Sequence, residues 1–471
     1  MGKPSRSKIA FAILILLAAI TASAQTFTTL LDFDGTNGIY PLGDLVQGTD
    51  GNYYGITSSG GAFSYGTVFR VTPSGQLTTI YSFCSQPNCS DGSYPEGGLL
   101  LTLDGAFYGT TAYGGDSTCI APYGCGTVFK VTAEGKLTTV HVFESSDGAV
   151  PWAGLVQYRG NFYGTTSAGG EVPCGQFSRG CGTVFKMTPA GAVTTLHVVD
   201  GSDGGYSVSP LVQASNGSFY GSTLEGGNPD CKGYPGCGGL FKVTPSGVFQ
   251  TLYLFGASGL PDAPLIQASD GNLYGTTING LVFKLTPGGK VTTLHDFGSG
   301  ILPASVVQGT DGNLYGSTFY GGTANLGTVF QLTLGGVLTY LQDFNFTNGA
   351  DPQEPILQAT TGSFYGAASY GGQDETNCPD GCGTLYSLSM GLGPFVSLTS
   401  TLGKPGQQVG ILGQGLTGAT SVSFNGTSAT FKVRSGTFLV VTVPTGVTSG
   451  YVTVNTPSGT LTSNVPFSLL P

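Results

Sequence analysis

Three short landmarks each occur seven times along this chain, always in the same order. A Tyr-Gly pair preceded by an aromatic residue or Leu begins at Tyr54, Tyr108, Tyr163, Tyr220, Tyr274, Tyr315 and Tyr365. A Gly-x-x-aromatic motif begins at Gly66, Gly126, Gly182, Gly238, Gly280, Gly327 and Gly383. A Thr-Thr-Leu type of segment begins at Thr28, Thr78, Thr138, Thr194, Thr251, Thr292 and Thr339. Landmarks at a regular period indicate a repeat architecture, here with a unit of about 52 residues.

Each unit contains four short β segments. In the second unit they are Gly98 to Thr102, Ala106 to Thr111, Gly126 to Thr132 and Lys136 to Phe143. β-branched and aromatic residues fill these segments, and Gly, Asp, Ser or Pro bound them. Because no segment has a sustained helical period of apolar residues, the chain is predicted to be all-β.

The two ends of the repeat region complement each other. The last unit stops after its third segment, Gly383 to Ser389, and an orphan copy of the fourth, Thr26 to Phe33, precedes the first complete unit. Pairing of the orphan with the last unit closes the array and removes exposed sheet edges. We therefore predict a seven-bladed β-propeller of four-stranded antiparallel blades, with an open solenoid as the alternative.

The N-terminus has the pattern of an export signal. Lys3, Arg6 and Lys8 precede an apolar run from Ile9 to Ile20, and Ala22-Ser23-Ala24 is a small-x-small cleavage site. We expect residues 1–24 to be removed and the protein to be secreted or held at the cell surface; an uncleaved anchor is the alternative. Residues 25–392 form the predicted propeller, and 393–471 a separate domain.

Charge excludes some partners. The formal net charge is -10, and only 9% of residues are charged, against roughly 25% in typical soluble domains. An acidic chain without clustered Lys and Arg is not expected to bind nucleic acid. We expect no membrane-spanning segment after signal cleavage, and no cofactor or metal. The sequence leaves the oligomeric state open.

The connections fall into two classes. First-to-second and third-to-fourth turns are short and alike, whereas second-to-third and unit-to-unit connections are longer and vary. In an up-and-down blade each class lies at one end of the strands, which defines a constant face and a variable face. Binding sites occur preferentially on variable loops, so the variable face is the predicted ligand surface.

All ten cysteines lie in variable connections as closely spaced pairs. Such pairs in an exported chain indicate five local disulfides, with metal binding as the alternative. The pairs are Cys84/Cys89, Cys119/Cys125, Cys174/Cys181, Cys231/Cys237 and Cys378/Cys382.

Aromatic residues of the variable loops are the candidate binding residues, together with one carboxylate. Aromatic faces on a polar, weakly charged surface suit sugar or peptide ligands. Packing of the Tyr-Gly-Gly tyrosines against the neighbouring blade is the structural alternative. The candidates are Tyr94, Glu96, Trp152 and Tyr206 in unit-to-unit loops, and Tyr113, Tyr320 and Tyr370 before Gly-Gly pairs.

No nucleophile–base motif or phosphate-binding loop occurs, so no catalytic residue is assigned. A secreted glycosidase-like enzyme is the alternative, because two loop carboxylates facing one cleft suffice for that chemistry. The loop carboxylates are Glu96, Glu171, Glu225, Asp230, Glu354, Asp374 and Glu375. His141, His197 and His295 share one repeat position on the outermost strand, where we expect them to face solvent. Asp91, Asp147 and Asp203 open unit-to-unit loops without the ligand spacing of a calcium loop.

Glutamines recur on the innermost strand of six units. They are predicted to satisfy backbone groups near the axis, with a polar pore lining as the alternative. They are Gln47, Gln157, Gln213, Gln267, Gln308 and Gln358.

The C-terminal segment has a different pattern, with seven short strands in fewer than 80 residues, as in an immunoglobulin-like β-sandwich. The stretches 406–413, 418–426 and 449–454 resemble the IPT/TIG family. That resemblance implies a spacer or adhesion module in an exported chain. The predicted strands are Val396 to Leu398, Gln408 to Leu412, Ser421 to Phe424, Ala429 to Val433, Phe438 to Val443, Gly450 to Asn455 and Val465 to Leu469.

The repeats, typified by Gly126 to Thr132 and Phe162 to Thr166, resemble the GloVer-type tandem repeats of exported bacterial proteins. The variable face, the paired loop cysteines, the loop aromatics and the C-terminal domain together lead us to expect a non-catalytic extracellular binding or adhesion protein whose partner is a glycan or a surface protein. A carbohydrate-active enzyme, hydrolase or lyase, and a purely structural envelope protein are the alternatives.

Overall fold

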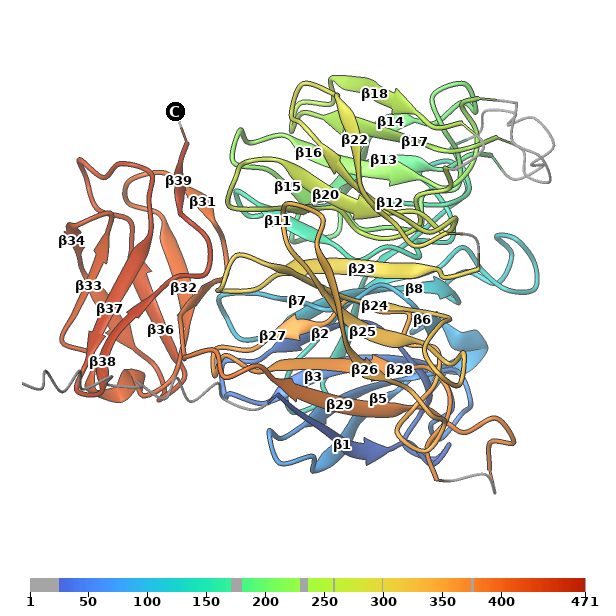
Figure 1. Cartoon of the computed structure of the whole chain (residues 1–471). Coiled ribbons are helices and arrows are strands. Elements are labelled where there is room, and N and C mark those ends of the chain that lie inside the picture. The colour runs from blue at the N-terminus through green and yellow to red at the C-terminus, as the bar shows by residue number, and fades with distance from the viewer. Residues whose placement is uncertain are drawn as a thin grey trace, which may run out of the picture.

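The computed structural model describes residues 25–170, 180–228, 236–256, 259–298, 300–373 and 377–470 (Figure 1). In these ranges the chain is almost entirely β-structure, and residues 26–389 form seven antiparallel sheets with a propeller-like arrangement. First strands of consecutive sheets contact one another, as β2 does with β7 and β27, so they form the inner ring. No helix in the described part of the chain has the length and apolarity needed to cross a bilayer.

The strands recur in the predicted order within each sheet. The first strands are β2 (Ile39–Gln47), β7 (Leu100–Leu101), β11 (Val156–Tyr158), β15 (Val212–Gln213), β19 (Ile266–Gln267), β23 (Pro303–Gln308) and β27 (Leu357–Gln358). The second strands are β3 (Tyr53–Ser59), β8 (Phe107–Tyr113), β12 (Asn161–Thr165), β16 (Phe219–Thr223), β20 (Leu273–Thr276), β24 (Leu314–Thr318) and β28 (Phe364–Ala368). The third strands are β4 (Thr67–Val71), β9 (Thr127–Val131), β13 (Thr183–Met187), β17 (Gly239–Val243), β21 (Leu281–Leu285), β25 (Thr328–Leu332) and β29 (Thr384–Ser389).

The outer strands complete the sheets. They are β5 (Leu77–Ser82), β10 (Leu137–Val142), β14 (Val193–Val198), β18 (Phe249–Leu254), β22 (Val291–Asp296), β26 (Leu338–Asp343) and, for the last sheet, β1 (Thr26–Asp32). The second sheet has one additional strand, β6 (Ser93–Pro95), which pairs with β8 as β7 does. A 3-10 turn at Pro87–Cys89 precedes β6.

The glycine of each Tyr-Gly landmark is required by packing within its sheet. A Cβ placed on Gly55 would lie 2.5 Å from the ring of Phe69 on the neighbouring strand, and the same clash recurs at Gly109 with Phe129. These phenylalanines also pack edge-to-face between sheets, as Phe83 does on Phe129 with 5.0 Å between ring centroids. The glycine of the first landmark and the aromatic residue of the second are therefore in contact on neighbouring strands.

The orphan N-terminal strand pairs where the sequence predicts. β1 is antiparallel to β29, from Thr26 opposite Ser389 to Asp32 opposite Thr384. A second connection lies at the inner ring, where Gln47 of the first sheet bonds Thr360 in a turn of the last. The first and last sheets are thus joined at both their outer and inner strands.

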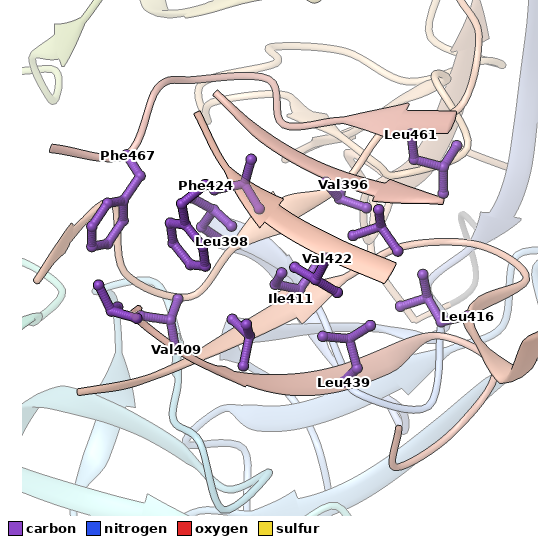
Figure 2. Close-up of a cluster of buried hydrophobic side chains, with 14 of the residues drawn as sticks. Val396, Leu398, Val409, Ile411, Leu416, Val422, Phe424, Leu439, Leu461 and Phe467 are labelled. Carbon is purple, nitrogen blue, oxygen red and sulfur yellow. The ribbon is translucent and has the colours of Figure 1, made fainter. Parts of the chain in front are cut away.

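The C-terminal segment forms two four-stranded sheets and a short parallel pair around its own apolar core (Figure 2). Phe424 and Phe467 pack edge-to-face in this core, with ring centroids 4.9 Å apart. The sequence missed β31 and β38 and merged β34 with β35. The strands are β30 (Ser397–Leu398), β31 (Leu402–Gly403), β32 (Gln408–Leu412), β33 (Ser421–Phe424), β34 (Thr427–Ala429), β35 (Phe431–Val433), β36 (Phe438–Thr442), β37 (Val452–Thr456), β38 (Gly459–Thr462) and β39 (Ser468–Leu469). A 3-10 turn at Leu416–Gly418 lies between β32 and β33.

This segment packs on the turns of the constant face (Figure 1). The hydroxyls of Ser435 and Thr437 both donate to the carbonyl of Thr49, at 2.8 and 2.7 Å, and Gln414 donates to the hydroxyl of Thr360 at 2.9 Å. Phe438 joins an apolar cluster with Leu101 of the second sheet. The constant face is therefore the contact surface between the two parts of the chain.

Candidate ligand-binding site

A central cavity of about 380 Å³ lies among the inner strands, on the side of the variable loops. Every one of the seven sheets contributes to its wall, from the segment that precedes or begins its first strand. The contributing residues are 42–44, 96–98, 152 and 154, 208–210, 262–264, 302–304 and 353–355. Because all seven segments meet at one cavity, the seven sheets surround it.

Four carboxylates line this cavity: Asp44, Glu96, Asp262 and Glu354. Each comes from a different sheet and is half-buried. None of the four belongs to an ion pair within the described residues. Leu42, Val208 and Ile278 add apolar surface to the same wall. The cavity therefore concentrates acidic groups in a partly apolar setting without a protein cation to balance them.

Burial raises the pKa of all four carboxyl groups. It raises the pKa of Asp44 to about 6 and those of Glu96 and Asp262 to about 7. The pKa of Glu354 rises to about 8, because burial is reinforced by the charges of Asp44, Glu96 and Asp262 and is only partly offset by the N–H donated by Gly43. At neutral pH the site therefore holds both protonated and ionised carboxyl groups.

Trp152 lines the cavity beside these groups and is the only tryptophan in the chain. Its ring packs edge-to-face on Tyr206, with centroids 5.4 Å apart and 73° between the planes. Its indole Nε1 is buried and has no acceptor among the described residues. Two predicted binding residues, Glu96 and Trp152, are thus brought together in one cavity.

Aromatic rings near the cavity form two packed groups, Trp152 with Tyr206 and Tyr113 with Tyr94 and Tyr65, and we call these five residues the aromatic track. The ring of Tyr94 lies 5.5 Å from that of Tyr65 and 6.0 Å from that of Tyr113, and both pairs are edge-to-face. Burial raises the pKa of Tyr206 to about 12, and the nearby charges of Tyr113, Glu225 and Glu96 add to the increase. Tyr65 is 37% exposed at the outer end.

Several predicted residues lie away from the cavity or outside the described ranges. Tyr320 is exposed and packs on Phe319, which does line the cavity. Tyr370 packs on Tyr40 of the neighbouring sheet at 4.9 Å, which is the structural alternative for the Tyr-Gly-Gly residues. Glu225 lies on a variable loop beside Tyr206, and burial raises its pKa. Glu171, Asp230, Asp374 and Glu375 lie outside the described residues.

Sequence reasoning missed Asp44 and Asp262. Aligning the segments that precede each Leu-Val-Gln type of strand would have found them. In that alignment Glu96 and Asp262 occupy the position of Trp152, and each of the three follows a proline. Glu354 falls one position later and Asp44 two positions later. All four carboxylates therefore fall within three adjacent positions of the repeat.

The predicted disulfides form wherever both cysteines are described. The bonded pairs are Cys84–Cys89, Cys119–Cys125 and Cys378–Cys382. Cys181 and Cys237 are also disulfide-bonded, and their predicted partners Cys174 and Cys231 lie outside the described residues. Among the described residues no cluster of His, Cys, Asp and Glu has the geometry to hold a metal ion.

The expectation that the histidines simply face solvent is wrong for two of them. His141 Nε2 lies 2.9 Å from Asp147, and His197 Nε2 lies 2.6 Å from Asp203. In the first unit, the hydroxyl of Tyr81 donates to Asp91 in the same way. These aspartates therefore fasten unit-to-unit loops to the outer strands, a contact that only the three-dimensional structure brings together.

Solved structures with a related fold include enzymes. A streptogramin B lyase superposes with a TM-score of 0.53 at 13% identity, covering 78% of this chain and 97% of that one. Virginiamycin B lyase from Staphylococcus aureus gives a TM-score of 0.52 at 13% identity, covering 78% of this chain and 99% of that one. At such identity the likeness shows the fold alone.

Sequence comparison shows the family. No curated protein matches the chain. The family model described as the Gloeobacter/Verrucomicrobia repeat matches in three overlapping stretches, residues 16–178, 88–280 and 261–439. These stretches span the whole repeat region. The chain therefore belongs to the Gloeobacter/Verrucomicrobia repeat family.

Proposed function

We propose that this protein is a non-catalytic, exported glycan-binding protein whose ligand enters the central cavity from the variable face. The observation that carries the proposal is the meeting of Glu96 and Trp152 in one cavity, at the inner end of the aromatic track. Aromatic rings stack on the apolar faces of sugars, and carboxyl groups exchange hydrogen bonds with sugar hydroxyls. A mixture of protonated and ionised carboxyls supplies both donors and acceptors.

The proposed architecture is a seven-bladed β-propeller over residues 25–392, closed by β1, followed by an immunoglobulin-like sandwich of the IPT/TIG type over residues 393–471. The pairing of β1 with β29 and the sharing of one cavity by seven sheets support the propeller. Two four-stranded sheets around a common core support the sandwich. The sandwich packs on the constant face and leaves the variable face to the ligand.

Export follows from the signal pattern, with cleavage after Ala24. The repeat family and the disulfides on the variable loops are consistent with an oxidising compartment outside the cytoplasm. In this proposal the disulfides stiffen loops that border the binding surface, which lowers the entropy lost when a ligand orders them.

A glycan array tests the proposal directly. The mature chain is expected to bind a defined subset of glycans, and Trp152→Ala is expected to abolish that binding. Tyr451→Ala is the matched control, because Tyr451 is 45% exposed on the C-terminal segment. Binding that survives Trp152→Ala would place the site elsewhere, and the absence of any glycan binding would overturn the proposal.

A second candidate function is acid–base catalysis on a carbohydrate. It is favoured by the convergence of four carboxylates from different sheets in one cavity, where burial raises the pKa of Glu96 to about 7 and that of Glu354 to about 8. Carboxyl groups that titrate near neutrality are suited to donate and accept protons at physiological pH. Incubation of the glycans bound on the array, followed by product analysis, separates the two functions. Cleavage that Glu354→Gln abolishes while binding persists would establish the enzyme.

A further inference from the structure

The aromatic track ends at a cavity with an unbalanced acidic lining, and that combination constrains the ligand beyond the proposed function on which it rests. Tyr65, Tyr94 and Tyr113 follow one another at ring spacings of 5.5 and 6.0 Å. Tyr206, on which the charge of Tyr113 acts, packs on Trp152 at the cavity wall, where Glu96 also lies. A single small molecule would contact only one or two of these side chains, whereas a ligand made of several rings can contact all of them.

The cavity lacks a positive group. The two carboxylate–lysine pairs of the described residues join Lys130 to Asp104 and Lys284 to Asp270, and none of these four residues lines the cavity. Asp44, Glu96, Asp262 and Glu354 therefore meet without a protein cation. Uncompensated carboxylates in a partly buried site attract a cationic group that can replace their lost hydration.

Two further polar atoms near the inner end of the track have no partner among the described residues. They are the buried Nε1 of Trp152, a donor, and the buried Oε2 of Glu225, an acceptor. A third, the hydroxyl of Ser305, is buried without a partner at the repeat position that Asp44 occupies in the first unit. Buried polar atoms in folded proteins are nearly always hydrogen-bonded, so atoms without protein partners indicate positions for ligand or water.

We propose that the ligand is a glycan chain of amino sugars, with sugar rings on the aromatic track and an ammonium group in the central cavity. The exposed parts of Tyr65, Tyr94 and Tyr113 contact successive sugar rings. The ammonium group donates to the carboxylates and lies beside the face of Trp152, an arrangement in which both contacts attract a cation. A neutral glycan makes only the first set of contacts, and a small amine makes only the second.

Three oligosaccharides of equal length separate these contributions. Calorimetric titration with β-1,4-linked hexamers of glucosamine, N-acetylglucosamine and glucose is performed at pH 6.5 and moderate salt, with spermidine as a cation that has no sugar rings. The glucosamine hexamer is expected to bind at least about tenfold more tightly than either neutral hexamer and than spermidine. Equal binding of all three hexamers would overturn the amino-sugar inference and leave glycan binding intact.

Other outcomes of the titration bear on the two proposals differently. Spermidine binding as tightly as the glucosamine hexamer would reduce the site to a cation site and overturn the inference. If neither the glucosamine hexamer nor the neutral hexamers bind, the proposed function is overturned as well. The failure of the inference and the failure of the proposed function therefore give different results.

Paired variants locate the two sets of contacts. Asp44→Asn is expected to weaken the glucosamine hexamer about tenfold and the neutral hexamers less, because the Asp44 carboxyl, whose pKa burial raises to about 6, is mostly ionised at pH 6.5. Glu134→Gln is the charge-matched control, because Glu134 is exposed on a constant-face turn. Tyr94→Ala is expected to weaken the hexamer about threefold to tenfold and to leave the glucosamine monomer unaffected. An equal effect of Glu134→Gln and Asp44→Asn would mean nonspecific attraction to an acidic protein and would overturn the inference.

Discussion

Gln47 and Thr360 are 313 residues apart and are joined by two hydrogen bonds, from Gln47 Nε2 to the Thr360 hydroxyl and from the Thr360 N–H to Gln47 Oε1, each 3.0 Å long. The same contact recurs between other neighbours. Gln267, Gln308 and Gln358 each accept the N–H of a turn residue in the preceding sheet. Four of the six inner glutamines therefore join neighbouring sheets, and Gln47 joins the first and last sheets in the same way.

Gln47→Leu is predicted to destabilise the protein, because it removes both bonds and leaves the buried Thr360 N–H without an acceptor. The expected loss in the free energy of unfolding is on the order of 2 kcal/mol, measured by denaturant titration. Gln157→Leu is the matched control from the same repeat position, since Gln157 lines an open pocket beside the C-terminal segment. Equal losses in the free energy of unfolding for the two variants would show that the junction of the first and last sheets does not depend on the Gln47 bonds.

The pair His197–Asp203 fastens a unit-to-unit loop, and its removal is predicted to lower stability. Asp203 also accepts the N–H of Asp200, so Asp203→Ala loses contacts to both the strand and the loop. We expect about 1–2 kcal/mol from this variant. A double-mutant cycle with His197→Phe should recover a coupling energy, whereas combining Asp203→Ala with His295→Phe should give additive effects. Additivity in both cycles would mean that the pair contributes nothing.

Stability is predicted to fall as pH rises from about 4 to 8. The folded-state pKa values of Asp44, Glu96, Asp262 and Glu354 are raised, so these groups stay protonated in the folded protein after they have ionised in the unfolded chain. The unfolded state therefore binds fewer protons in this window, and its ionisation favours unfolding. Below the unfolded pKa values both states are protonated and the penalty disappears.

Glu354→Gln removes the group with the highest of these pKa values. Its pH–stability curve should be flatter, and at pH 8 it should be more stable than the wild type by on the order of 2 kcal/mol. Glu134→Gln should leave the curve unchanged. A parallel downward shift of the Glu354→Gln curve at all pH values would contradict the assignment.

The disulfide Cys84–Cys89 closes a short loop immediately before Tyr94, and the N–H of Gly115 bonds the carbonyl of Cys89. Replacing both cysteines by serine should cost about 2 kcal/mol by freeing the unfolded loop. It should also weaken glycan binding, because Tyr94 and Tyr113 flank this loop. Loss of stability without any loss of affinity would restrict the disulfide to a purely structural role.

Much of the fold could be predicted from the sequence, because each contact within a sheet repeats. Gly55 and Phe69 recur as landmarks since neither tolerates replacement where they touch. The number of units, the strand order and the pairing of Thr26 to Asp32 with the last unit followed from counting. The docking of Ser435 and Thr437 on Thr49 could not be predicted, because it joins two different folds through hydroxyls that no repeat marks.

The site was predictable only in part for a related reason. Glu96 and Trp152 were found because they stand in variable loops. Asp44 and Asp262 were missed because no local motif distinguishes a carboxylate that lines the central cavity from one that faces solvent. Which carboxylates meet depends on how the seven inner segments converge, and convergence is a property of the closed ring. The His197–Asp203 contact was missed because a loop folds back on its own strand.

Fluorescence of Trp152 reports directly on entry of a ligand into the central cavity, because the chain has a single tryptophan and it lines the cavity. We predict a saturable change in Trp152 emission during titration with a bound glycan, with a midpoint equal to the calorimetric dissociation constant. Trp152→Phe should retain calorimetric binding and lose the signal, and Trp152→Ala should lose both. Calorimetric binding that leaves Trp152 emission unchanged, or that persists in Trp152→Ala, would contradict a ligand site in the central cavity.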